Sequence, residues 1–311
     1  MHSPNRIRSF LIAIITAAAI PLPAGAQVES AVLDEYALGS ERAVGAGTYR
    51  LDSRMTTFGP QGDRTGTTAY LLTLRCEVLE EEPRQTCTVL DYRIKRDDAD
   101  PVAIPSVIGF EYHPTAEPDS VRPMFGIDPT RFEHLVDSTG ATVPVDQAYH
   151  VYNSFIDFHM FDQVLAAQAS GNGIEDLRRI GDRIVHEAAY SDVPVQVGNT
   201  VKEGSHFRNG EMTLEFKGLS AVDDRPTAII AYDSGESDFE VIMEPMPGFR
   251  VTTTGSSHYR GDFYVDFETQ WVRRATLYEL VVAETALPVS PGTVQNIIER
   301  EIEISLSGSA E

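Results

Sequence analysis

The sequence predicts a mainly β protein of the α+β class, with an antiparallel curved sheet or half-barrel meanders on which two central helices pack. Apolar and polar residues alternate before residue 148 and again after residue 195, which is typical of half-buried strands. Between these parts the apolar period changes from two to about 3.6 residues, as in helices. Short connections such as 222–225 and 234–236 predict antiparallel neighbours. A sheet that is apolar on one side needs a cover, and the helices can provide it.

The first 26 residues have the three parts of a secretory signal peptide. Arg6 and Arg8 precede an apolar run over residues 10–20, and Ala24-Gly25-Ala26 supplies a small-residue cleavage motif. The apolar run is shorter than the roughly 20 residues that a spanning helix needs, and no cysteine follows the cleavage motif to carry a lipid. We therefore expect a secreted or periplasmic protein without a membrane span, which begins with a flexible stretch over residues 27–46.

Residues 47–147 form the predicted N-terminal β-rich part. It contains a hairpin whose two strands carry Cys76 and Cys87, and an oxidising compartment favours a disulfide between them. Residues 101–123 follow with five prolines, a spacing that excludes a regular helix or a central strand. We expect an irregular connection there, followed by a short hairpin around residues 137–140.

The hairpin with the two cysteines has two conflicting pairing schemes. The apolar faces match when Leu74 lies opposite Leu90, whereas a disulfide between Cys76 and Cys87 needs a register that differs by one residue. A shift of one residue turns a strand's side chains to the other face. The sequence therefore predicts a β-bulge between the disulfide and the rest of the ladder.

Residues 148–190 form a predicted helical pair. The first helix, around residues 149–163, is apolar almost all round and is expected to be buried. The second, over about residues 174–188, has a single apolar stripe and is expected to lie on a surface. Residues 195–307 then continue as a C-terminal antiparallel meander of six or seven strands.

Within this meander, residues 259–282 form a strand with a Gly261-Asp262 stretch that turns into another long strand. This rhythm resembles the curved half-barrels of periplasmic carriers of the LolA and LppX type, over about the last hundred residues. The resemblance implies a sheet curled around helices, with an apolar cavity that accepts acyl chains. The chain departs from that pattern in its helical and proline-rich insert and in having no lipobox.

The composition is strongly acidic, with a formal net charge of −22. Such a field repels nucleic acid and anionic lipid surfaces, so neither is an expected partner. The expected partners are instead an apolar small molecule or an envelope protein. No cofactor is predicted.

An aromatic and apolar group on the first helix, together with one strand residue, is the candidate ligand wall. The same residues could equally form the core that covers the sheet, which is the commoner role of large apolar side chains. The candidate ligand-binding residues are Tyr152, Phe155, Phe158, Met160, Phe161 and Tyr259.

Two groups could carry chemistry. His159, Asp162 and His186 combine imidazole and carboxylate groups that can bind a metal or transfer protons, although no His-Glu-x-x-His signature is present. The His258 region places serines and Asp262 near a histidine, without the Gly-x-Ser-x-Gly elbow of many hydrolases. Capping or solvated polar roles explain both groups as well.

These observations support three functional hypotheses. The favoured one is a non-enzymatic binding module for an apolar, lipid-like ligand or a partner protein in the concave face of the sheet. The second is a hydrolase or metal-dependent enzyme that uses His159, Asp162 and His186 or the His258 region. The third is a structural or envelope-associated protein without a small ligand.

Overall fold

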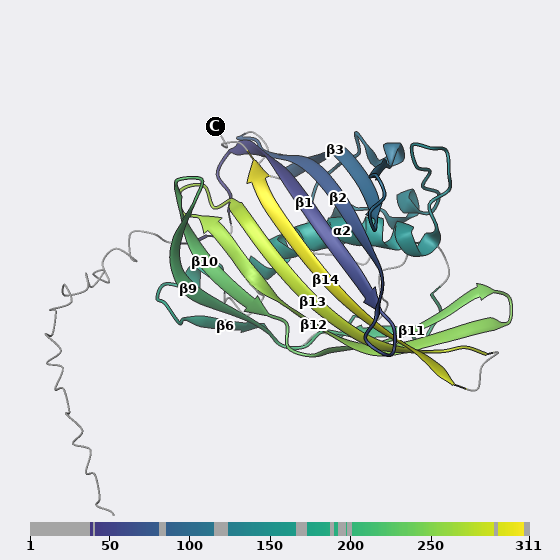
Figure 1. The fold of residues 1–311 in the computed structure, drawn as a ribbon. Helices are drawn as coiled ribbons and strands as arrows, with labels where there is room; N and C mark the ends of the chain where they lie inside the picture. Colours follow the sequence, from purple (N-terminus) through teal and green to yellow (C-terminus); the bar gives the residue numbers. More distant parts are fainter. Residues whose placement is uncertain are drawn as a thin grey trace, which may run out of the picture.

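A computed structural model shows one antiparallel, open and curved sheet that bends around a helix (Figure 1). It describes residues 38–39, 41–80, 85–114, 124–165, 173–186, 190–191, 197, 201–288 and 292–307. The predicted signal peptide lies outside this set, as does most of the stretch expected to be flexible. Each end of the sheet's main path is a short strand, in the order β4-β3-β2-β1-β14-β13-β12-β10-β9-β6.

The strands that build the sheet are long in its centre and short at its margins, and all strand pairs among the described residues are antiparallel. β11 pairs with β12 and β8, β7 pairs with β8, and β5 pairs with β3. The bounds are β1 Gly45–Phe58, β2 Arg64–Val78, β3 Gln85–Arg96, β4 Val102–Ala103, β5 Glu111–Tyr112, β6 Arg183–His186, β7 Tyr190–Ser191, β8 His206–Arg208, β9 Met212–Val222, β10 Arg225–Asp233, β11 Ser237–Met246, β12 Phe249–Asp266, β13 Val272–Ala286 and β14 Thr293–Ser307.

The first and last long strands lie side by side at the centre of the sheet. β1 pairs with β14, so that Leu51 lies opposite Ile304, and β1 pairs on its other side with β2. The two β-rich parts expected from the sequence are therefore joined into a single sheet. The 222–225 connection between β9 and β10 is a two-residue hairpin, in which Asp223 and Asp224 both have positive φ as a type I′ turn requires.

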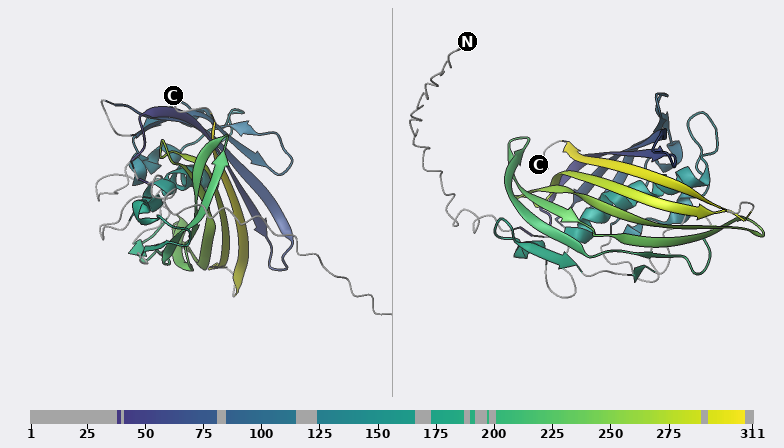
Figure 2. Two further views of the ribbon diagram at one scale, coloured as in Figure 1. Left: turned by 90° about the vertical axis from the view of Figure 1, so that its left-hand side faces the viewer. Right: turned by 60° about the horizontal axis from the view of Figure 1, so that its bottom comes forward.

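Helix α2 (Val145–Leu165) lies against the concave side of the sheet, here called the inner face (Figures 1 and 2). The helix is buried on most of its surface, as its apolar composition predicts: Val151, Phe155 and His159 have no exposed surface. Side chains of the inner face and of α2 form one contiguous apolar core. None of the helices in the described part of the chain has the length and apolar character that a membrane crossing requires.

The prediction of a second central helix over residues 174–188 is wrong. Ile174–Asp176 is a short 3-10 helix, and residues 183–186 form β6 on β9. Gly181 has a φ of +92°, and the Asp182 carboxylate accepts hydrogen bonds from the backbone N–H groups of Arg178 and Arg179. These local bonds compete with a helical ladder. The apolar stripe instead follows a period of two, with Ile184 buried and Val185 exposed.

In its described residues, 101–114, the proline-rich connection is irregular, with the two-residue strands β4 and β5 on either side of a short 3-10 helix. Val136 and Thr142 form an isolated bridge around the predicted turn at residues 137–140. The Asp137 carboxylate closes that turn by accepting hydrogen bonds from the backbone N–H groups of Thr139 and Ala141. The 3-10 helices of this region are η1 Pro105–Val107, η2 Met124–Gly126 and η3 Pro129–Phe132.

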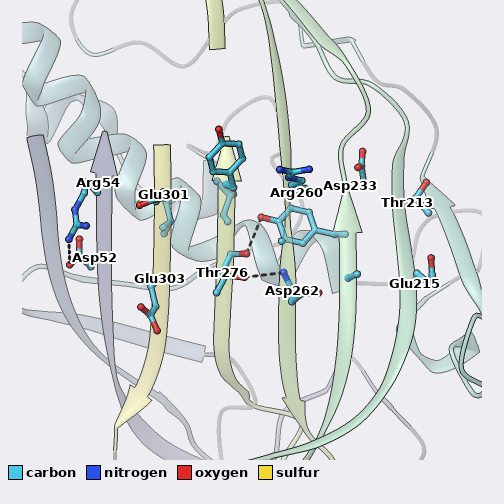
Figure 3. A pocket seen from close by; sticks show the side chains of 16 residues that line it. Asp52, Arg54, Thr213, Glu215, Asp233, Arg260, Asp262, Thr276, Glu301 and Glu303 are labelled. Carbon is cyan, nitrogen blue, oxygen red and sulfur yellow. Dashed lines mark hydrogen bonds and ion pairs between the residues drawn. The ribbon is translucent and has the colours of Figure 1, made fainter. Parts of the chain in front are cut away.

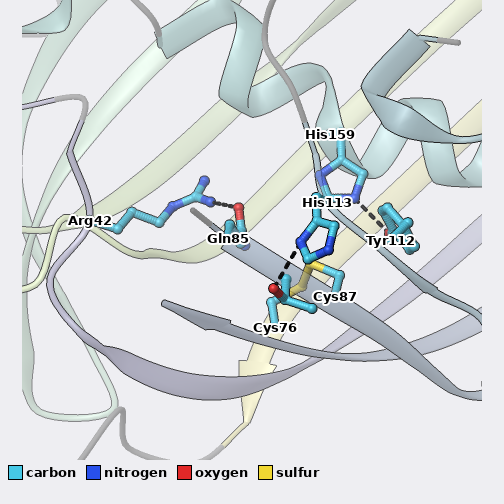
Figure 4. Close-up of a disulfide and its surroundings, with 8 residues drawn as sticks. Arg42, Cys76, Gln85, Cys87, Tyr112, His113 and His159 are labelled. Atoms are coloured by element: carbon cyan, nitrogen blue, oxygen red, sulfur yellow. Dashed lines mark hydrogen bonds between the residues drawn. A yellow bond between two sulfur atoms is a disulfide. The ribbon is translucent and has the colours of Figure 1, made fainter. Parts of the chain in front are cut away.

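The disulfide between Cys76 and Cys87 is present, and both cysteines are fully buried (Figure 4). The predicted β-bulge is confirmed: the register shifts at Thr73 and Leu74. Leu74 therefore lies opposite Val89 rather than Leu90. Val89 enters the core and Leu90 is exposed, so the expectation that Leu90 lies on the apolar face is wrong. The bulge is the physical reason, because its extra residue reverses the facing of the strand beyond it.

The last residues of the stretch expected to be flexible are packed against the sheet. Leu38 is buried, and the Gly39 N–H donates a hydrogen bond to the Gln270 side chain. The indole N–H of buried Trp271 donates to the carbonyl of Ala43 at 3.1 Å. These bonds fix the entry of the chain into β1, which begins at Gly45.

Candidate functional site

Three of the aromatic residues proposed as a ligand wall are packed inside the core. Phe155 stacks on Tyr92 with ring centroids 5.9 Å apart, and Tyr152 meets Phe132 edge to face at 5.2 Å. Phe158 meets Tyr49 of β1 edge to face at 5.0 Å. These contacts attach α2 to β1 and β3. Ligand contact by these residues remains a prediction.

One face of α2 is only half buried. It carries Tyr149, Asn153, Ile156 and Met160, which recur at helical spacing, and we call it the α2 stripe. Ile156 and Met160 pack against the margin of the core, as does half-buried Tyr259 on the inner face of β12. Met160 and Tyr259 from the predicted ligand wall thus lie where the core meets less buried surface. The side chain of Phe161 lies outside the described set.

A buried cluster of three charges lies beside the α2 stripe. Arg300 of β14 contacts Asp157 of α2 through Nη1 at 2.7 Å and Glu279 of β13 through Nε at 2.6 Å. Glu279 and Arg300 lie opposite each other in the sheet, and Tyr259 lies opposite Glu279 on its other side. The three charged side chains are about nine-tenths buried. We call Asp157, Glu279 and Arg300 the inner ion cluster.

Burial changes the protonation of the groups in and around this cluster. Desolvation raises the pKa of Asp157 from 3.8 to about 6, even though the charge of Arg300 lowers it. Desolvation likewise raises the pKa of Tyr149 and of Tyr259 to about 12, and lowers the pKa of His150 to about 4. At neutral pH both phenols are therefore protonated and His150 is uncharged, so these three groups around the cluster are neutral.

The predicted metal residues have separate surroundings. His159 is fully buried, and its Nε2 hydrogen-bonds the hydroxyl of Tyr112 at 2.7 Å (Figure 4). Its ring also contacts Phe125 and Phe158. Asp162 lies in α2, and its side chain is outside the described set. His186 ends β6 opposite Met212, and burial lowers its pKa. Among the described residues, no three His, Cys, Asp or Glu side chains converge as a metal site would require.

The His258 region divides between the two faces of the sheet. His258 pairs with the Asp233 carboxylate at 2.8 Å on the side of the sheet that is turned away from α2, here called the outer face. Ser257 is buried on the inner face, where its hydroxyl donates to the Tyr259 hydroxyl at 3.3 Å. The alternation of β12 thus turns Ser257 away from His258, which is the arrangement of a satisfied polar strand. Burial alone would raise the pKa of Asp233. The hydrogen bonds from His258 and from the Gly235 N–H lower it by more than burial raises it, so the net shift of the pKa is downward.

The outer face carries a trough of about 630 Å³ that crosses six strands (Figure 3). Twelve of its lining residues form two neighbouring rows, in which each residue lies opposite the next across the sheet. The first row is Glu215, Ala231, Asp262, Thr276, Glu303 and Asp52. The second row is Thr213, Asp233, Arg260, Tyr278, Glu301 and Arg54. α2 lies behind the strands in this view, so the trough is separated from the core by the sheet.

The two rows differ in charge. The first row carries four carboxylates and no cation; Ala231 and Thr276 separate the first three carboxylates, whereas Glu303 and Asp52 are direct neighbours. The second row carries both signs of charge, because each of its two carboxylates is followed by an arginine. Its Arg260 lies 5.3 Å from the ring of Tyr278 in a cation–π contact. Some of the carboxylates form ion pairs with arginines outside the two rows: Glu303 contacts Arg274 at 2.9 Å and Glu215 contacts Arg183 at 2.7 Å.

No protein-family model matches this sequence, and no curated protein matches it. Among solved structures the chain is similar to lipovitellin, in a structure that concerns lipid–protein interactions in that protein. The TM-score is 0.36 and the sequence identity is 10%. The match covers 87% of this chain and 26% of the lipovitellin chain, so this chain spans about a quarter of that protein's length.

Sequence reasoning missed the inner ion cluster and the trough for the same reason. Both depend on which residues lie opposite each other in strands that are far apart in the chain; Arg300 and Asp157 are 143 residues apart. The available signal was the polar half of each strand's alternation, which does place Glu301, Glu303 and Asp52 on a solvent face. The strand register that places these residues opposite each other could not be predicted from the sequence.

Proposed function

We propose that this protein is a secreted or periplasmic, non-enzymatic binding module that holds an apolar, lipid-like ligand on the inner face of its curved sheet. The observation that carries the proposal is the α2 stripe. Ile156 and Met160 are half-buried apolar side chains at the margin of the core, on a helix that the sheet curves around. An apolar ligand that covered this stripe would extend the core without disturbing Phe155 or Tyr152.

Apolar burial provides enough free energy for such a complex. A chain of about 15 methylenes gains roughly 0.8 kcal/mol for each methylene removed from water, or about 12 kcal/mol in all. Part of this gain offsets the loss of translational and conformational freedom on binding. The remainder still corresponds to a stable complex, and no catalytic group is needed for it.

The inner ion cluster limits the polar end of the ligand. One guanidinium faces two carboxylates, so the cluster has an excess of negative charge whenever Asp157 is ionised. The protonated phenols of Tyr149 and Tyr259 can donate hydrogen bonds to a neutral acceptor. We therefore expect a ligand whose polar end is uncharged or cationic, since an anionic end would be repelled.

Native mass spectrometry of the mature protein, purified from a secretory compartment, tests this proposal. We expect an additional mass that is lost after mild organic extraction. A mass lost only on chelation would favour the metal-dependent enzyme. A bare polypeptide mass that also fails to bind the neutral apolar fluorophore N-phenyl-1-naphthylamine would overturn the proposal and favour a structural or envelope-associated protein.

Matched charge substitutions locate the ligand. Ile156→Asp places a carboxylate on the α2 stripe and should abolish fluorophore binding. Val282→Asp places the same charge on the outer face, where Val282 is already 46% exposed, and should leave binding unchanged. Circular dichroism of both variants controls for folding. Equal binding by both variants would show that the ligand lies elsewhere.

A further inference from the structure

We propose that the trough on the outer face binds an extended, basic segment of a partner protein. The trough lies on the opposite side of the sheet from the proposed apolar ligand, so binding at one site can be tested independently of binding at the other. The first support is the trough itself, a depression of about 630 Å³ on the face of the sheet that α2 does not cover.

The depth of the trough comes from small residues between larger ones. Ala231 and Thr276 stand in the first row where the flanking positions carry longer acidic side chains. Beneath them, Gly261 lies against the carbonyl of Thr276 and the ring of Tyr232, where a Cβ would collide at 1.8 and 2.8 Å. Gly261 thus allows the close approach of β12 and β13 at the floor.

The length of the trough fits an extended peptide. Six neighbouring strands span five gaps of about 4.8 Å, so each row is about 24 Å long. An extended chain rises about 3.3 Å per residue, and about seven residues would therefore follow one row. Such a segment would cross the strands on the exposed face instead of adding to a sheet edge.

The charge of the trough favours a basic segment. Six carboxylates and two arginines line it. In the described part of the chain, Asp262 and Glu301 form no ion pair, so their carboxylates can accept hydrogen bonds from Lys or Arg side chains of a partner. The chain's net charge of −22 adds a long-range attraction for the same partner.

The arrangement of like charges supports this assignment. Glu303 and Asp52 lie directly opposite each other, and like charges in that position destabilise a strand pair. Arg274 beside Glu303 and Arg54 beside Asp52 offset part of this repulsion, and a bound cation would relieve the rest. In the second row, Arg54 and Arg260 can donate to the carbonyl oxygens of a peptide, which a simple polyamine does not have. The two rows together therefore match a peptide backbone with basic side chains.

Fluorescence anisotropy with a labelled, capped peptide of alternating Lys and Gly residues, seven residues long, tests the proposal. We expect saturable binding to the wild-type protein that weakens as the salt concentration rises. Asp262→Asn combined with Glu303→Gln should weaken binding about tenfold, because two charge-assisted contacts are lost. Ala231→Lys should also weaken binding, since it places a cation in the floor between Glu215 and Asp262.

A charge-matched variant separates the trough from the overall field. Asp98→Asn combined with Glu111→Gln removes the same charge at two exposed positions outside the trough and should leave the affinity within about twofold. Equal weakening by both double variants would overturn the proposal, as would no binding of the Lys-Gly peptide. Binding of a neutral oligosaccharide in place of the peptide would overturn it as well and assign the trough to a sugar.

Discussion

The two faces of the same six strands carry opposite kinds of residue. Between the two outer rows runs a third row that faces the core, and apart from Gly261, which is half-buried and has no side chain, its residues are at most 4% exposed. That row is Leu214, Tyr232, Gly261, Leu277, Ile302 and Ser53. Each strand therefore contributes alternately to an apolar core and to a charged surface, so neighbouring residues in the chain have unrelated roles.

The charges on the two faces also differ in how strongly they are coupled to folding. The inner ion cluster holds its charges in side chains about nine-tenths buried, whereas Arg274 and Glu303 on the outer face are 47% and 58% exposed. An exposed pair is screened by water, and a buried pair that loses one partner is left with an uncompensated charge. Substitutions of similar chemistry should therefore have very different effects on the two faces.

Removal of the inner cation should have the largest effect. Arg300→Met leaves Asp157 and Glu279 buried without a counter-charge, and we expect the free energy of unfolding to fall by about 3–5 kcal/mol. Urea denaturation at pH 7.5 measures it. The matched variant Arg274→Met removes an arginine from an exposed pair and should cost less than about 1 kcal/mol. Similar losses in the two variants would contradict the difference between the faces.

The buried disulfide should have the next largest effect. Cys76 and Cys87 close a short loop, and Cys76→Ala combined with Cys87→Ala should lower the free energy of unfolding by about 3 kcal/mol, chiefly because the unfolded chain gains freedom. Thermal denaturation of the variant, compared with wild-type protein under dithiothreitol, checks this. A reductant that leaves wild-type stability unchanged would show that the bond contributes nothing.

The pH dependence of stability should reveal Asp157. Folding raises the pKa of Asp157 from 3.8 to about 6, so the folded state binds the proton more tightly than the unfolded chain. The stabilisation that this gives is fully present below pH 3.8 and is lost as the pH rises through about 6. Relative to Asp157→Asn, the wild-type protein should lose up to about 3 kcal/mol between pH 4 and pH 7.5. Urea denaturation at both pH values gives the difference.

An exposed acid serves as the control for this pH effect. Asp98→Asn should follow the wild-type pH dependence of the unfolding free energy, because Asp98 is exposed in a turn. If the Asp157→Asn variant also follows it, the ionisation of Asp157 is not coupled to folding and the inner ion cluster would need another description.

The smallest effect is expected on the outer face. Glu303→Gln removes the ion pair with Arg274 but also the repulsion from Asp52, and these changes should offset each other to within about 0.5 kcal/mol. Chemical denaturation would show this near-neutral result. A loss above about 1.5 kcal/mol would mean that the first row stabilises the fold.

The sequence predicted the parts of the fold that depend on local patterns. Short segments of the chain were enough to predict the alternation of the strands, the apolar first helix, and the bulge required by Cys76 and Cys87. The second helix was a false prediction because Gly181 and Asp182 break a stripe whose spacing fitted a helix. Leu90 was misplaced because the exact position of a bulge depends on the partner strand.

The candidate sites were less predictable because they are built from distant segments. The sequence did select Met160 and Tyr259, which lie at the margin of the core. It also proposed His159 as a metal ligand; the structure places that imidazole in the core, hydrogen-bonded to the Tyr112 hydroxyl, and its metal role stays a prediction. Arg300 was overlooked, since nothing in its neighbourhood along the chain indicates that Asp157 of a central helix will contact it.

The pairing of β1 with β14 has a consequence for the order of folding. β1 starts at Gly45 and acquires its second neighbour only when Thr293–Ser307 has been synthesised. Until then the inner ion cluster lacks Arg300, and both β1 and β13 present unpaired backbone groups at a free edge. Such edges are the sites at which incomplete chains join one another. Chains that end before β14 should therefore aggregate.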